Sequence, residues 1–321
     1  MIPRRLARLT RLLAGVLTCL LTAAAANGVS EEQAVNAFAR ERYEVGRILN
    51  IAHAGASSLA PQNTMAAGRK AFDTGADVWG VDVQLTADGV FVLMHDDTLD
   101  RTTNVEDLFP IRAPWRVNEF TFEEVRSLDA GSWFVQEDPF EQIKEGSISA
   151  AELAAYAGEA VPSLREALAF VSDCQWLIDI EVKPMEAAAR ETAARRLVDL
   201  IREAGTESRV LVSSFDHAFL IEVMTIDSFL ATGALTIFAP LNTVDTLSAM
   251  GVDVYLPSPV GFTADLLEQL AERRIHVFVW TYNTQSQLEF ILGHSGITGI
   301  YTDFPQRLGP LLVETEETEA P

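Results

Sequence analysis

Residues 51–103, IAHAGASSLAPQNTMAAGRKAFDTGADVWGVDVQLTADGVFVLMHDDTLDRTT, decide how the rest of the chain is interpreted. His53 and His95 each end an apolar run with the character of a β-strand, and Asp82 lies on a third such run between them. Two imidazoles and a carboxylate at neighbouring strand ends would form a site for metal-assisted acid/base chemistry. A single histidine is more often structural, so this prediction depends on the pair.

The same stretch predicts one local feature of the sheet. Only QLTADG, residues 84–89, separates the apolar runs 77–83 and 90–95. This connection is too short for the helix that links parallel strands, and it is rich in turn-forming residues. We therefore predict a β-hairpin, or an extended excursion, at this point.

Outside this stretch the chain alternates between short apolar runs and amphipathic segments. With the hairpin strand set aside, eight strands remain for a parallel sheet, and eight β/α repeats in about 250 residues favour a (β/α)8 TIM barrel. Active sites in such barrels lie at the carboxyl ends of the strands. The strand runs are 48–53, 77–83, 90–95, 176–183, 209–214, 232–238, 252–256, 276–281 and 299–302, and the helical stretches include 63–74, 185–204, 217–228, 244–250, 264–273 and 285–292.

Segments flanking and interrupting the barrel complete the predicted organisation. We assign a lead-in helix to residues 27–48, the barrel to 49–310 and an acidic tail to 311–321. Residues 105–160 form an insertion with a helix capped by Thr121 and Glu124, and we expect this insertion to cap the barrel mouth and to shape specificity.

The amino terminus predicts export. Residues 1–26 contain four arginines, an apolar run of ten residues at 12–21 and then TAAAA, which is the pattern of a cleaved secretory signal peptide and is too short for a membrane span. We therefore expect a periplasmic or secreted protein without a stable membrane span after cleavage. One cysteine, Cys174, would remain, so no intramolecular disulfide can form.

The charge of the chain excludes some partners. The formal net charge is -22, and loss of the arginines in residues 1–26 would make it more negative still. Proteins that bind nucleic acid or anionic membranes usually carry a basic surface. We therefore expect no nucleic-acid partner, and a phosphate-bearing ligand would require a metal ion or a few well-placed lysines.

A second polar cluster lies on the strand LIDIEVKP, residues 177–184. Alternation along a strand places Asp179, Glu181 and Lys183 on one face. Buried charges need partners, so this face forms either a salt-bridged core cluster or a metal and phosphate site. Asp82 faces the same way as Gly80 and could join the cluster from its own strand.

The pattern of motifs resembles the glycerophosphodiester phosphodiesterase family. The resemblance spans nearly the whole chain after residue 26, with the motifs in family order. The matching segments are His53-Ala54-Gly55, Pro61-Gln62-Asn63-Thr64, Gly75-Ala76-Asp77, Gly80-Val81-Asp82-Val83, Thr86-Ala87-Asp88-Gly89, His95-Asp96, Leu99-Asp100-Arg101-Thr102-Thr103, Leu128-Asp129-Ala130-Gly131-Ser132-Trp133-Phe134, Val161-Pro162-Ser163-Leu164, Ile180-Glu181-Val182-Lys183, Ser213-Ser214-Phe215, Trp280-Thr281-Tyr282-Asn283 and Thr302-Asp303-Phe304-Pro305.

This resemblance implies a metal-dependent phosphodiesterase on a (β/α)8 barrel. His53 and His95 would act as general acid and base, and Lys183 would neutralise phosphate charge. Asp82 and Glu181 would bind a divalent ion, calcium or magnesium. The products would be glycerol phosphate and an alcohol. The head group of the substrate and the identity of the ion stay open.

Two further residues match segments near the expected mouth of the barrel. Asn63 is a candidate for substrate binding, and Trp280 could wall the glycerol or head-group site or simply pack in the core.

Three positions depart from the family pattern. Ala54 replaces an arginine that follows the first histidine, Gly80 replaces a metal-binding glutamate, and Gln62 replaces another glutamate. Asp179 is a candidate for the missing carboxylate, and its pairing with Lys183 is the rival interpretation. Retention of both histidines favours an enzyme, whereas Ala54 and Gly80 favour an impaired barrel that binds a phosphodiester-like ligand.

Overall fold

The computed structural model describes residues 47–319 and the side chains of residues 47–313. The predicted signal peptide, almost all of the predicted lead-in helix 27–48, and the last two residues of the tail lie outside this range. At its start, Arg47 and Ile48 are not helical and lead directly into the first strand.

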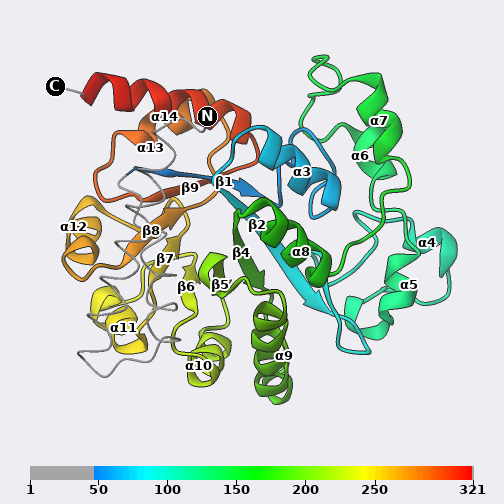
Figure 1. The fold of residues 1–321 in the computed structure, drawn as a ribbon, viewed down its shortest axis with the longest axis horizontal. Coiled ribbons are helices and arrows are strands. Elements are labelled where there is room, and N and C mark those ends of the chain that lie inside the picture. The colour runs from blue at the N-terminus through cyan, green and yellow to red at the C-terminus, as the bar shows by residue number, and fades with distance from the viewer. Residues whose placement is uncertain (1–46, 320–321) are drawn as a thin grey trace, which may run out of the picture.

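Eight parallel strands form a closed barrel, as the alternation in the sequence predicted (Figure 1). Each strand pairs with the next around the ring, and β1 closes it by pairing with both β2 and β9. The strands are β1 (Leu49–His53), β2 (Val78–Leu85), β4 (Leu177–Val182), β5 (Val210–Ser214), β6 (Ala231–Thr236), β7 (Val254–Pro257), β8 (His276–Val279) and β9 (Gly299–Thr302).

The predicted hairpin is confirmed. The long strand β2 extends beyond its barrel neighbours, and β3 (Phe91–Leu93) returns antiparallel to it, with Val83 opposite Leu93 and Leu85 opposite Phe91. At the end of β3 the backbone N–H of Met94 donates to the carbonyl of Asp82 at 2.9 Å. The hairpin therefore brings the segment that carries His95 back to the level of Asp82.

Helices surround the barrel, and several begin at the polar caps that the sequence provides. Thr64, Ser163, Thr263 and Thr284 each accept a hydrogen bond from a backbone N–H in the first turn, which satisfies a donor that lacks a partner inside the helix. The helices are α3 (Met65–Asp73), α8 (Leu164–Cys174), α9 (Arg190–Glu203), α10 (His217–Ile226), α11 (Thr243–Met250), α12 (Ala264–Glu272), α13 (Gln285–Leu292) and α14 (Pro305–Glu319), with 3₁₀ turns η2 (Ala187–Ala189) and η3 (Glu207–Arg209).

Two apolar layers account for the packing of the barrel. The larger layer lies between the strands and the helices, where Trp79 packs against α3 so closely that a Cβ on Gly68 would approach its ring to 2.5 Å. The smaller layer fills the barrel interior with side chains such as Leu49, Val78 and Phe278. These apolar side chains fill the barrel interior. The polar residues lie above them, at the carboxyl ends of the strands.

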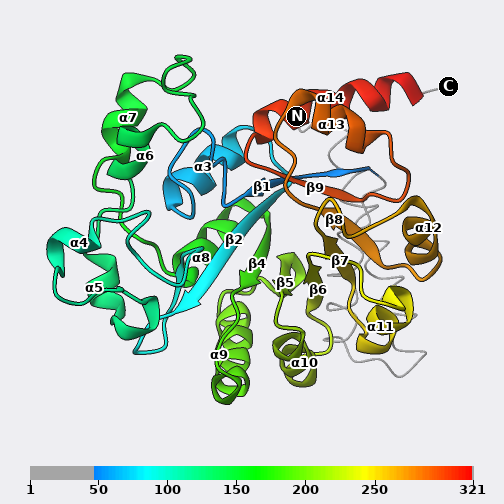
Figure 2. The same cartoon turned by 180° about the vertical axis from the view of Figure 1, so that it is seen from behind.

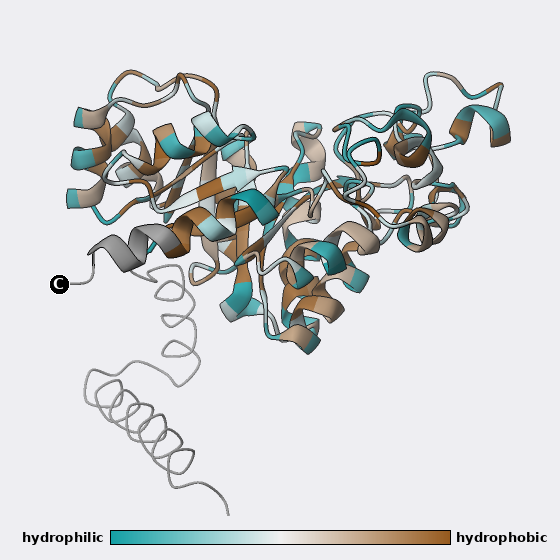
Figure 3. Cartoon of the chain, turned by 90° about the horizontal axis from the view of Figure 1, so that it is seen from above, coloured by the Kyte–Doolittle hydropathy of each residue, from teal (hydrophilic) through white to brown (hydrophobic). Residues whose placement is uncertain are grey.

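The insertion forms a smaller lobe beside the barrel, visible in Figure 2 and from above in Figure 3. Its first part packs in an apolar cluster shared with β3, which includes Val92, Phe120 and Val125, and the predicted capping box of Thr121 and Glu124 is present. Its elements are α4 (Val105–Leu108), η1 (Val117–Glu119), α5 (Phe122–Arg126), α6 (Ser132–Glu137) and α7 (Ala150–Tyr156).

Within residues 47–319, no helix combines the length and the apolar character that crossing a bilayer requires.

Candidate active site

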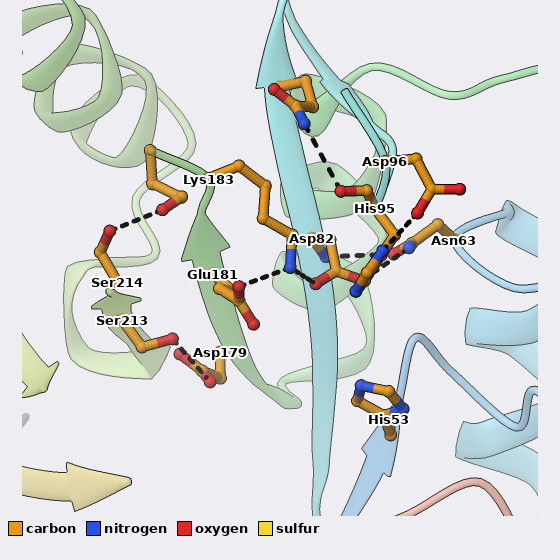
Figure 4. Close-up of polar contacts among 12 residues, drawn as sticks. His53, Asn63, Asp82, His95, Asp96, Asp179, Glu181, Lys183, Ser213 and Ser214 are labelled. Atoms are coloured by element: carbon orange, nitrogen blue, oxygen red, sulfur yellow. Dashed lines mark hydrogen bonds and ion pairs between the residues drawn. The ribbon is translucent and has the colours of Figure 1, made fainter. Parts of the chain in front are cut away.

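A pocket of about 170 Å³ opens at the carboxyl ends of the barrel strands (Figure 4). Most of the residues predicted for the site line it, and none of its lining residues comes from the insertion 105–160. They are His53, Ala54, Gly80, Val81, Asp82, His95, Asp179, Glu181, Lys183, Ser213, Phe215, Leu235, Leu256, Trp280, Thr281 and Tyr301.

His53 ends β1 and is oriented by a carboxylate from the other end of the chain. Its Nδ1 lies 2.8 Å from Oδ1 of Asp303, which directly follows β9. Asp303 is itself held by the Ser57 hydroxyl at 2.9 Å and by the Asn283 amide at 2.6 Å. This arrangement fixes the imidazole ring and leaves its Nε2 for a ligand in the pocket.

The same neighbours control the protonation of His53. Burial alone would lower the pKa of this imidazole, but the charge of Asp303 and the hydrogen bond to it, together with the charges of Asp82 and Glu181, raise the pKa to about 9. His53 is therefore a cation at neutral pH.

His95 has a similar arrangement in a more open setting. Its Nδ1 lies 2.7 Å from Oδ1 of Asp96, and Arg101 binds the other oxygen of this carboxylate. The hydrogen bond from His95, and then Arg101, hold the pKa of Asp96 well below its usual range. Since 44% of the His95 side chain is exposed, this imidazole can exchange protons with solvent.

Lys183 joins the two central carboxylates. Its Nζ lies 2.7 Å from Asp82 on β2 and 2.5 Å from Glu181 on β4, and Figure 4 shows the ammonium between them. Burial would lower the pKa of Lys183, but these two charges raise it. The lysine is therefore firmly protonated, and the salt-bridged alternative that the sequence left open is present for Glu181 and Lys183, which Asp82 joins.

Asn63 positions Asp82. Its side-chain N–H donates to Oδ2 of Asp82 at 2.8 Å, and its carbonyl oxygen accepts the backbone N–H of Asp82 at 3.1 Å. Both ends of the amide are engaged, and Asn63 is not among the residues that line the pocket. Its contact with substrate stays a prediction, whereas its contact with Asp82 is direct.

Gly80 and Asp179 are neighbours across the sheet. They are aligned in the register of β2 and β4, one layer below the aligned pair Asp82 and Glu181. The ring of Tyr301 covers Gly80, since a Cβ there would lie 3.0 Å from Cε1 of Tyr301 and 3.3 Å from the carbonyl oxygen of Ala52. A longer side chain at residue 80 would therefore require the tyrosine to move.

Asp179 carries an unsatisfied oxygen in this layer. Tyr301 and Ser213 both donate hydroxyl hydrogens to its Oδ2, while its buried Oδ1 has no hydrogen-bond partner among the described residues. Burial raises the pKa of Asp179 to about 7, against the effect of these two hydrogen bonds. The rival pairing of Asp179 with Lys183 is not among the ion pairs of this lysine, which are with Asp82 and Glu181.

The donor chemistry of the pocket fits a hard divalent cation, which prefers carboxylate oxygens. Asp82 and Glu181 offer such oxygens, and the buried, unpaired Oδ1 of Asp179 is a third in the same pocket. Over the part of the chain that the structure describes, however, the side chains do not bring three acidic, histidine or cysteine groups around one point. In this structure one oxygen of Asp82 and one of Glu181 are already paired with Lys183.

Trp280 forms an apolar wall. Its Nε1 donates to the carbonyl of Leu256 at 2.9 Å, and its ring packs edge-on against Phe215 with centroids 5.8 Å apart. The indole both lines the pocket and packs against its neighbours, and its contact with the glycerol or head group stays a prediction.

A second groove of about 470 Å³ adjoins the pocket at Lys183, which lines both. Arg116 and Asn118 of the insertion lie along it, together with Asp97 and Glu186. The insertion therefore borders this groove, which contains charged and apolar side chains, rather than the pocket that holds the histidines.

The sequence did not assign roles to Asp303 and Tyr301. The alternation of side chains along β9 could have identified both as candidates, because it places residues 299, 301 and 303 on the inner face. Their partners, however, lie 250 and 122 residues away along the chain, and no local pattern identifies such pairs.

Comparisons with known proteins agree with this arrangement. The sequence profile of the Glycerophosphoryl diester phosphodiesterase family matches residues 53–307. The glycerophosphodiester phosphodiesterase of Caldanaerobacter subterraneus subsp. tengcongensis is 32% identical over 267 residues, which cover 82% of this chain and 96% of that protein.

Two solved structures share the fold. An Oleispira antarctica phosphodiesterase in complex with the product sn-glycerol-3-phosphate matches with a TM-score of 0.70 and 23% identity, over 84% of this chain and 98% of that one. The glycerophosphodiester phosphodiesterase of Agrobacterium tumefaciens matches with a TM-score of 0.61 and 21% identity, over 81% and 98% of the two chains.

Proposed function

The chain belongs to the glycerophosphoryl diester phosphodiesterase family, and we propose that it hydrolyses glycerophosphodiesters to a glycerol phosphate and an alcohol by histidine acid/base catalysis. The observation that carries this proposal is the pair of imidazoles at one barrel mouth. The Nδ1 of each is held by a carboxylate, Asp303 or Asp96, and the protonated lysine Lys183 lies in the same pocket.

The environments of the two histidines suggest how the roles divide. His53 is a cation at neutral pH, so it can give a proton to the leaving alcohol. His95 takes a proton from the attacking hydroxyl, either water or the glycerol's own. An oxygen–phosphorus bond forms, the bond from phosphorus to the alcohol oxygen breaks, and that oxygen leaves with the proton of His53. If the glycerol's own hydroxyl is the attacking group, the product is a cyclic phosphate, which a water molecule then opens to the glycerol phosphate.

Lys183 supplies positive charge for the phosphate group. Asp82 and Glu181, with Asp179 as the candidate third carboxylate, would hold a calcium or magnesium ion, which would supply further positive charge for the phosphate group. Asn63 keeps Asp82 in place, and its own contact with substrate is part of the proposal.

Catalytically impaired binding of a phosphodiester-like ligand is the second candidate. It is favoured by Ala54 and Gly80, which stand where the family has an arginine and a glutamate, and by the ring of Tyr301 above Gly80. Export is a further proposal, supported by the signal-like pattern of residues 1–26.

The test is release of sn-glycerol-3-phosphate from glycerophosphocholine and glycerophosphoethanolamine, with calcium, magnesium or chelator present. We expect turnover in the wild type that the chelator reduces. Absence of turnover with every ion, combined with measurable binding of glycerophosphocholine, would favour the impaired binder instead.

A further inference from the structure

Large apolar side chains gather on one side of the barrel mouth. Among the residues whose burial the structure describes, eleven large hydrophobic side chains are exposed, and five of them directly follow β5, β6 or β7. We call these five the apolar rim: Phe215, Ile237, Phe238, Leu241 and Val260. Single exposed apolar residues are ordinary, but a cluster beside a pocket indicates a binding surface.

Hydrogen bonds fix the backbone beneath the rim. The Ser258 hydroxyl donates to the carbonyl of Ile237 at 2.6 Å, and its N–H donates to the carbonyl of Thr236 at 3.0 Å. The Tyr255 hydroxyl donates to the carbonyl of Gly261 at 2.8 Å. The loops after β6 and β7 are thus joined side by side, and Phe238 and Leu241, 71% and 94% exposed, project from a well-bonded base.

The rim continues the apolar wall of the pocket. Leu235 and Leu256 line the pocket from the strands β6 and β7, whose following loops carry the rim. Phe215 belongs to both, since it lines the pocket, is 37% exposed and packs against Trp280. An apolar substrate group that extends out of the pocket on this side would therefore lie on the apolar rim.

The loops after β6 and β7, which carry four of the five rim residues, lack charged side chains although the chain is strongly acidic. Neither residues 235–242 nor residues 256–264 include a charged side chain, within a sequence that has 46 acidic and 24 basic residues. The second groove on the other side of the mouth contains Asp97, Arg116 and Glu186. The two sides of the mouth therefore differ in charge: the second groove has charged side chains, and the loops after β6 and β7 have none.

We propose that the substrate carries an acyl chain on its glycerol half, so that this site cleaves monoacyl glycerophosphodiesters, with the chain on the apolar rim and the head group in the second groove. This inference rests on the function proposed above. Water attacks phosphorus, the bond to the head-group oxygen breaks, and the products are a monoacylglycerol phosphate and the free alcohol. His95 accepts the proton that water loses, and His53 donates its proton to the head-group oxygen as the alcohol leaves.

An acyl chain fits this surface better than a protein partner does. The apolar surface starts inside the pocket, at Leu235 and Leu256, where a substrate group reaches but a folded partner cannot. The net charge of -22 also disfavours docking on an anionic bilayer, so the expected substrate is a single zwitterionic lipid.

The experiment compares kcat/KM for glycerophosphocholine and for 1-decanoyl lysophosphatidylcholine below its micelle concentration. We expect kcat/KM to be at least about tenfold higher for the acylated substrate, because burial of roughly 60 Å² of apolar surface suffices for that factor. Equal values for the two substrates would overturn the inference while leaving the phosphodiesterase intact.

Variants separate the rim from the pocket. The double variant Phe238→Ser/Leu241→Ser should lower kcat/KM for the acylated substrate about tenfold, while kcat/KM for glycerophosphocholine stays unchanged. Ile111→Ser is the matched control, since Ile111 is 95% exposed on the insertion, away from the rim, and should affect neither substrate. A loss of the same size for both substrates would contradict the proposal.

A binding readout covers the case of an inactive protein. Calorimetric titration of the His95→Ala variant with the same two ligands should show at least about tenfold tighter binding of the acylated one. If neither ligand is turned over by the wild type but this preference persists, the proposed function fails and the acyl site stands. Equal affinities would reject the acyl site.

Discussion

The two sides of the barrel mouth differ in charge and in how their side chains are held. The charged side, built from β1 to β4 and β9, holds Asp82, Glu181, Lys183 and both histidines in a network where each charge has a partner. The apolar rim, after β5 to β7, has no charged residue and leaves large side chains in solvent.

This difference shows how one pocket can separate chemistry from recognition. A buried charge without a partner is strongly destabilising, so every residue of the charged side is constrained by its neighbours. Exposed apolar side chains impose no such constraint on folding. The charged side should therefore respond strongly to any substitution, and the rim should respond only through its ligand.

The largest effect is expected from His95→Ala. Loss of the proton acceptor should reduce kcat by about 10²- to 10⁴-fold for any phosphodiester. Glycerol 3-phosphate release measures this effect, and His294→Ala, a histidine outside the pocket, serves as the control. Activity of His95→Ala equal to that of the wild type would remove the catalytic role from the charged side.

Lys183→Met tests whether the charged side is interlocked. Removing the ammonium leaves Asp82 and Glu181 facing each other without their cation, which should cost about 3 kcal/mol of unfolding free energy. Urea denaturation measures this cost. Adding Asp82→Asn to the variant should recover part of the loss, and no recovery would mean that the lysine acts by packing alone.

Asp179→Asn tests the unpaired oxygen beneath the pocket. If Asp179 contributes to cation binding, calorimetry should show calcium or magnesium binding weakened on the order of tenfold or more. The control is Asp173→Asn, an exposed carboxylate at the end of α8. Unchanged cation affinity in Asp179→Asn would exclude Asp179 as a ligand and leave Asp82 and Glu181 as the two proposed ligands.

The pH dependence of stability tests the pairing of His53 with Asp303. The folded pKa of about 9 lies above the ordinary value of 6.5, so the stabilisation is fully present below pH 6.5 and is lost as pH rises through 9. The stability advantage of the wild type over His53→Gln should shrink over this window in urea titrations. The effect should be modest, because solvent reaches a third of the imidazole.

The smallest effect is expected at the rim itself. Phe238→Ser with Leu241→Ser should change the unfolding free energy by no more than about 0.5 kcal/mol, because both side chains are exposed. Thermal and urea denaturation measure it. A clearly larger loss would mean that these side chains stabilise the fold, and the contrast between the two sides would weaken.

Most of the fold could be predicted from periodicity. The short link 84–89 allowed only a local return of the chain, and the structure has the hairpin there. The alternation of Asp179, Glu181 and Lys183 identified the polar face of β4, because side-chain direction along a strand follows from backbone geometry alone.

The partners within the site could not be predicted in the same way. The sequence left Lys183 open between a salt-bridged cluster and a phosphate site, and it offered Asn63 as a substrate ligand. The structure pairs Lys183 with Asp82 and Glu181, and Asn63 with Asp82, and contact of Lys183 or Asn63 with substrate stays a prediction. Which of several polar groups pair at a barrel mouth depends on rotamers and on strand register, and neither leaves a mark in local sequence.

The closure of the barrel sets the order in which this protein can become active during its synthesis. His53 is made early, but the carboxylate that orients it, Asp303, is made 250 residues later, just after the strand that pairs with β1. A growing chain that stops before β9 has neither a closed barrel nor an oriented His53. The acid of the proposed reaction is thus oriented only after β9 is made, so a chain that stops before β9 carries no complete catalytic centre.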